Sequence, residues 1–190
     1  VYVDRASGRP VALPDALQDV ARLLVGLAPL GLWLVFSVWA ERRAPQPRAG
    51  LIVVAVVTAL AANAVTIPFI EQVLQPQAWL SHTSAITRIV GYTLSVGVTT
   101  EFTKYLVVRY SIWPARIETR MDGLAYAIAA SLGFVTVWNL RAVFGPQETL
   151  DALAIVVFDT TITGLAGGLV IGYGLSEMAL GQPSPFIGPL

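Results

Sequence analysis

The sequence contains no cysteine and only one histidine, His82. Without cysteine there can be no disulfide, no thiolate nucleophile and no cysteine-ligated metal. One histidine also rules out a multi-histidine metal site built from this chain alone. Charged residues are scarce as well: they make up 13% of the 190 residues, whereas soluble domains carry about a quarter. The twelve basic and twelve acidic residues cancel, so there is no basic excess of the kind that nucleic-acid partners require.

Long apolar runs account for most of the chain, with 55% hydrophobic residues and a mean hydropathy of +0.68. A membrane-spanning helix needs about 20 mostly apolar residues. Five runs approach that length: 23–40, 50–70, 89–108, 123–140 and 152–175. They lack the period-two alternation of barrel strands. The sequence therefore predicts an all-α, polytopic transmembrane helical bundle of about five spans over residues 23–180, with an N-terminal tail (1–22) and a Pro/Gly-rich tail (181–190).

The arginines predict the orientation of these spans. Cytoplasmic loops are enriched in Lys and Arg, and here the first connection (41–50) and the third (109–122) carry most of them. We therefore expect these two connections and the C-terminus to be cytoplasmic and the N-terminus to lie outside. The expected location is a bacterial cytoplasmic membrane, with the lipid bilayer and helices of other membrane subunits as partners.

Small residues recur every four positions in the last two runs. They are Gly164, Gly168 and Gly172 in one and Ala125, Ala129 and Gly133 in the other. Such ladders let helix backbones approach closely in a membrane. They predict packing within the bundle, with a dimer face as the alternative.

Three ionisable residues, Glu101, Lys104 and Asp159, lie inside apolar runs. An ionisable group at the centre of a bilayer costs about 3 kcal/mol on insertion scales, so such residues face the bundle interior and pair. Glu101 and Lys104 are three residues apart on one helix face and are predicted to pair with each other. Neighbouring threonine hydroxyls are expected to satisfy Asp159.

The segments that carry these charges resemble the PrsW family of intramembrane proteases. "TTEFTKYLVV" is similar to the segment around the family's EExxK signature, with Thr100 on the first Glu, Glu101 on the second and Lys104 on the Lys. "FDTTITGLAGGLVIGYG" is similar to the helix that carries the family histidine, with Asp159 in its place and Thr163 four residues later. The resemblance extends over roughly 33–173.

A third segment, "MDGLAYAIAASLGFVTVWNL", is similar to the family's DGxxYG…GFxxxEN helix. Trp138 falls where the family has Glu. The positions that agree with the family pattern are Asp122, Gly123, Tyr126, Gly133, Phe134 and Asn139.

The resemblance implies a site in which acidic residues and a histidine, around a metal, activate a water against a peptide bond. The family positions of that site are Glu101, Lys104, Asn139 and Asp159. Three catalytic positions differ in this chain, at Thr100, Trp138 and Asp159. We therefore expect a non-catalytic binding or scaffold subunit without a cofactor, belonging to a larger membrane complex. The alternative is an active glutamic or zinc-dependent intramembrane protease with an altered site, in which Glu101 and Asp159 hold the water as a carboxylate pair.

Helix depth argues against that carboxylate pair. Along straight helices Glu101 lies about 18 Å, and Asp159 about 10 Å, from the outer ends of their runs. If the site is vestigial, Glu101 should pair with Lys104, while Trp138 and Asp159 face elsewhere.

Overall fold

The computed structural model describes residues 15–41, 48–112, 117–145 and 149–181, with the side chains of 15, 36–41, 48 and 49 left aside. All regular structure in this part of the chain is helical. In chain order the helices are α1 (Asp15–Glu41), α2 (Arg48–Ala61), α3 (Pro76–Leu80), α4 (Ala85–Tyr92), α5 (Val98–Ser111), α6 (Arg120–Val143) and α7 (Leu150–Leu180). Three π-helical segments continue them: η1 (Ala62–Thr66), η2 (Phe69–Leu74) and η3 (Thr93–Gly97).

Most helices extend past the apolar runs that predicted them, because polar residues can continue a helix beyond the membrane core. α1 begins at Asp15, inside the expected N-terminal tail. The second helix continues through η1 and η2 to Leu74, and a short α3 follows Gln75, whose φ is 44°. Residues 71–88, which separate the second and third apolar runs, are therefore largely helical. Thr119, Thr149 and Ser84 cap the N-termini of α6, α7 and α4, as hydroxyl residues do by accepting a backbone N–H.

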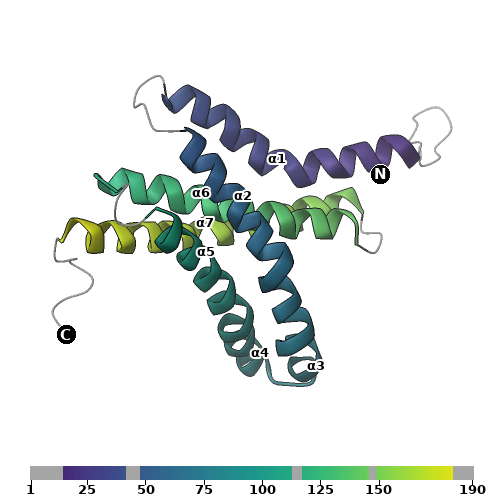
Figure 1. The fold of residues 1–190 in the computed structure, drawn as a ribbon. Helices are drawn as coiled ribbons and strands as arrows, with labels where there is room; N and C mark the ends of the chain where they lie inside the picture. The colour runs from purple at the N-terminus through teal and green to yellow at the C-terminus, as the bar shows by residue number, and fades with distance from the viewer. Residues whose placement is uncertain (1–14, 42–47, 113–116, 146–148, 182–190) are drawn as a thin grey trace.

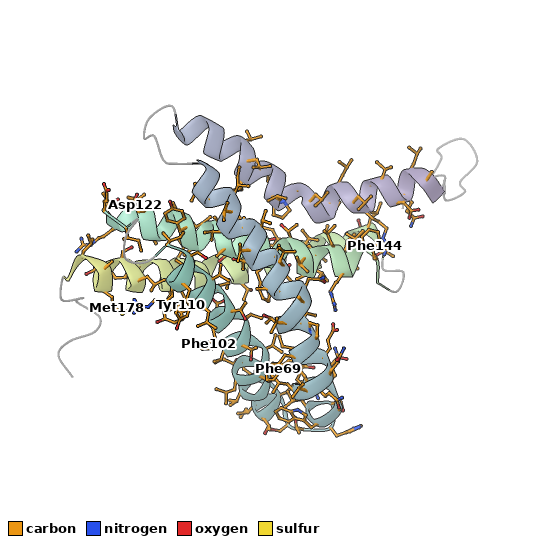
Figure 2. The ribbon with its side chains drawn as sticks, in the orientation of Figure 1. Phe69, Phe102, Tyr110, Asp122, Phe144 and Met178 are labelled. Atoms are coloured by element: carbon orange, nitrogen blue, oxygen red, sulfur yellow. The ribbon has the colours of Figure 1, made fainter. Side chains whose placement is uncertain are left out.

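The described chain is an all-α membrane protein. Four of its helices are long and apolar enough to cross a bilayer: 16–35, 50–80, 120–143 and 150–180. The helix that runs without a break over 85–111 through α4, η3 and α5 is also long enough. Glu101, Lys104 and several threonines make it the most polar of the five. Apolar side chains such as Phe102 and Phe144 point outward from the bundle (Figure 2), as expected for lipid-facing positions.

α6 is the central helix and packs against α7, α2 and α1. In Figure 1, α1, α6 and α7 run in similar directions, whereas α2 and the α4–η3–α5 helix cross them and converge near α3. The hydroxyls of Thr66 and Thr103 join these two crossing helices by a 2.8 Å hydrogen bond. α5 also packs on α7, so α5, α6 and α7 meet.

Small residues make the closest helix contacts, as their spacing predicts. A Cβ at Gly164, Gly168 or Gly172 of α7 would collide with α6. A Cβ at Gly133 of α6 would instead collide with the backbone of Ala55 in α2. Both ladders therefore pack inside the bundle.

Candidate functional site

A pocket of about 220 Å³ lies where η3, α5, α6 and α7 meet. It gathers family positions from three separate stretches of sequence, although Asn139 is not among its lining residues. Its lining residues are Val96, Gly97, Thr100, Glu101, Lys104, Phe134, Val135, Trp138, Asp159, Thr160, Thr163 and Gly164. Glu101 and Asp159 line the same pocket from helices that cross. The Glu101 carboxyl packs against Gly167, which lies about 12 Å along α7 from Asp159, so the depth argument against a close carboxylate pair stays a prediction.

Lys104 is the buried anchor of the site, with only 2% of its surface exposed. Its Nζ lies 2.5 Å from Glu101 Oε1, one helical turn earlier on the same face of α5. The ammonium also donates a 2.9 Å hydrogen bond to the carbonyl oxygen of Gly164 on α7. The predicted Glu101–Lys104 pair is thus present, and it ties α5 to α7.

Gly167 provides the space for the Glu101 carboxyl group. A Cβ at Gly167 would collide with the carboxyl carbon and both carboxyl oxygens of Glu101. Oε1 is held by Lys104, whereas Oε2 is buried and has no hydrogen-bond partner. One face of the Glu101 carboxyl therefore packs against the backbone of α7 at Gly167. Its Oε2 can still accept a hydrogen bond.

Trp138 and Asp159 also line the pocket, contrary to the expectation that they face elsewhere. The Trp138 ring stacks on Phe134, with 6.2 Å between ring centroids. Asp159 is exposed on α7. The pocket wall on α6, where the family has a glutamate, is therefore aromatic in this chain. Among the described residues, Asp159 is the second carboxylate that lines the pocket, after Glu101.

Asn139 lies next to the pocket but does not line it. Its side chain is fully buried, and its Oδ1 accepts a 2.6 Å hydrogen bond from Thr160 of α7. Its Nδ2 has no partner. Asn139 therefore reaches the site only through Thr160, which itself lines the pocket.

Asp122 has a structural role at the far end of α6. Its Oδ2 accepts hydrogen bonds from the backbone N–H groups of Glu118 and Thr119, at 3.0 and 2.7 Å, and so completes a capping box with Thr119. Figure 2 shows Asp122 and Phe144 at opposite ends of α6. Asp122 thus caps a helix and stands about 25 Å along it from Asn139.

The donor set of the pocket does not fit a zinc ion. Zinc takes three or four nitrogen, oxygen or sulfur ligands from the protein. In the described ranges no three His, Cys, Asp or Glu side chains come together. The pocket offers Glu101 and Asp159, and the ammonium of Lys104 already binds the first.

Gly164, Gly167 and Phe134 are site residues whose roles the sequence did not reveal. Gly164 belongs to the recognised ladder, but its use of a carbonyl to bind Lys104 depends on a neighbouring helix. Gly167 lies outside that ladder and carries no local signal beyond being a second small residue on the same helix. Phe134 matches the family pattern, but its stacking on Trp138 requires only the helical spacing of four.

Comparisons with known proteins complete the description of the site. Neither the curated proteins nor the solved structures contain a match to this chain. The sequence does match the PrsW family intramembrane metalloproteases over residues 46–162, which is more than half of the chain and runs from the start of the second helix into the pocket-lining part of α7. On this match, and with the signature positions gathered around one pocket, the chain belongs to the PrsW family.

Proposed function

We propose that this chain is a non-catalytic PrsW-family protein that binds a transmembrane segment of a partner subunit. The observation that carries the proposal is the composition of the pocket. The two family acids are replaced by Thr100 and Trp138, and the family histidine is replaced by Asp159. The remaining acid, Glu101, is bound by Lys104. A general base must be free to take a proton from a water, whereas one oxygen of the Glu101 carboxyl is bound by the Lys104 ammonium, at 2.5 Å.

The pocket is suited to helix contact. Its walls are largely apolar and aromatic, with Phe134, Val135, Val96 and Trp138 beside threonine hydroxyls. Interhelical association in membranes relies on close packing and on hydroxyl hydrogen bonds. A partner helix that presents a small residue and a hydrogen-bond donor would match this surface and the unpartnered Oε2 of Glu101.

One observation favours the second candidate, an active protease with an altered site. Glu101 and Asp159 line the same pocket, and two carboxylates can share a proton and hold a water if they approach each other. In that case Glu101 Oε2, which has no partner, would be the atom that accepts the proton.

A cleavage assay tests both candidates. The full chain is reconstituted in liposomes with a panel of single-span peptides that carry a fluorophore and a quencher. We expect wild type, Glu101→Gln and the exposed-site control Asp151→Asn to release no fluorescence above protein-free liposomes. Cleavage by wild type and Asp151→Asn that Glu101→Gln lacks would overturn the non-catalytic proposal. The triple variant Thr100→Glu, Trp138→Glu, Asp159→His, supplied with zinc, tests whether restoring the family residues creates activity.

Photo-crosslinking tests the binding function directly. A benzophenone amino acid at position 138 should capture one defined membrane subunit that also co-purifies stoichiometrically in mild detergent. The same group at Ile155, a lipid-exposed position on α7, should not capture it. Equal capture from both positions would contradict a binding site at the pocket.

The proposed orientation places the first and third connections in the cytoplasm. In support, α1 ends and α6 begins at the same end of the bundle in Figure 1. Cysteines introduced at Pro47 and Ala115 should be labelled only from the cytoplasmic side. A cysteine at Gln77, exposed in α3, should be labelled only from outside. Reversed labelling would show the opposite orientation.

A further inference from the structure

Arg22 of α1 is a buried arginine that has no partner in the part of the chain that the structure describes. Only 8% of its surface is exposed. Its Nε and Nη2 are buried and donate no hydrogen bond. Most buried arginines are paired, so an arginine left in this state indicates a ligand that supplies the missing acceptors.

The described neighbours of Arg22 are apolar, and none of the described acidic residues is its counter-ion. Leu23 and Val25 pack on a cluster of Val143, Leu153 and Val157 at the end of α6 and the start of α7. One turn after Arg22, Gly26 lies directly against Val143. The nearest acidic residue along α1, Asp19, is exposed and is not within ion-pair distance in the described structure.

Arg22 lies near the N-terminal end of the span 16–35 and immediately precedes the apolar run 23–40. Its neighbours Leu23, Val25 and Gly26 pack where α6 ends and α7 begins. In Figure 2 the N-terminal half of α1 passes close to Phe144, which labels this end of α6. Little of α1 is covered by the other described helices, so this seam lies at the outside of the bundle.

Phosphate is the anion that fits these observations. The guanidinium group presents parallel N–H donors that match two phosphate oxygens, and Nε with Nη2 is such a pair. Basic pockets between transmembrane helices bind the headgroups of anionic lipids. We propose that Arg22, in the seam between α1, α6 and α7, binds the phosphate of an anionic phospholipid. Arg22 itself lies outside the region that matches the family, 46–162, and does not line the pocket.

Lipid-dependent thermal unfolding tests this site. The full chain is delipidated in neutral detergent and titrated with phosphatidylglycerol, phosphatidylcholine or inorganic phosphate. Phosphatidylglycerol should raise the Tm of wild type and of Arg88→Gln, a control arginine that bonds only to loop carbonyls in the described structure. In Arg22→Met and Arg22→Gln the apparent Kd for phosphatidylglycerol should rise about tenfold or more, as when other charged contacts between a protein and its ligand are removed.

Arg22→Met also separates a lipid ligand from an internal partner. Without added lipid this variant should be at least as stable as wild type, because it removes a buried charge that nothing neutralises. A lower Tm of Arg22→Met than of wild type without lipid would show that the chain itself satisfies Arg22 and would contradict a lipid ligand. Equal lipid shifts in wild type and Arg22→Met, or an equal effect of inorganic phosphate, would likewise overturn the proposal.

Discussion

Replacing Gly133 by alanine is expected to lower the free energy of unfolding by about 2–3 kcal/mol, within the range for overpacked cores. A Cβ at this position would collide with the carbonyl oxygen of Ala55 and would lie 2.8 Å from the carbonyl carbon of Ala55. Both atoms belong to the backbone of α2, so no side chain can rotate to relieve the contact. α2 would have to move away from α6, which forms the centre of the bundle.

Gly174→Ala is the matched control for Gly133→Ala. Gly174 also lies inside a long helix, and a Cβ there would meet nothing within 4 Å. Alanine favours a helix over glycine by about 1 kcal/mol, so this variant should be neutral or more stable. The measurement is unfolding in mixed micelles with increasing SDS. Equal effects of the two substitutions would show that α2 and α6 do not touch at Gly133.

Replacing Lys104 by methionine should also destabilise the protein, by about 2–3 kcal/mol. Removing one member of a buried ion pair leaves the other charge uncompensated, at about 3–5 kcal/mol when both are fully buried. The Glu101 side chain is 32% exposed, which reduces that cost. The carbonyl of Gly164 also loses its hydrogen bond from the ammonium.

The double variant Glu101→Gln, Lys104→Met distinguishes the ion pair from simple packing. It removes both charges, so it should recover most of the stability lost in Lys104→Met in the same SDS titration. In the double-mutant cycle, the double variant should lose less stability than the sum of the losses of its two single variants, by well more than the experimental error. A double variant that is as unstable as the sum of its single variants would show that Lys104 stabilises the bundle through packing alone.

The sequence predicted the features that depend on a single helix. Each apolar run falls within one long helix of the structure, because length and hydropathy are properties of each segment. The spacing of three residues predicted the Glu101–Lys104 pair, since helical geometry places both side chains on one face. The four-residue ladders identified the packing faces of α6 and α7 for the same reason.

Only the tertiary structure decided which helices meet and at what depth. Glu101, Trp138 and Asp159 share one pocket because the crossing of the helices brings different depths together. The role of Gly167 under the Glu101 carboxyl and the burial of the Arg22 side chain likewise depend on contacts between helices. Local patterns cannot encode them, because one helix does not determine the angle at which another crosses it.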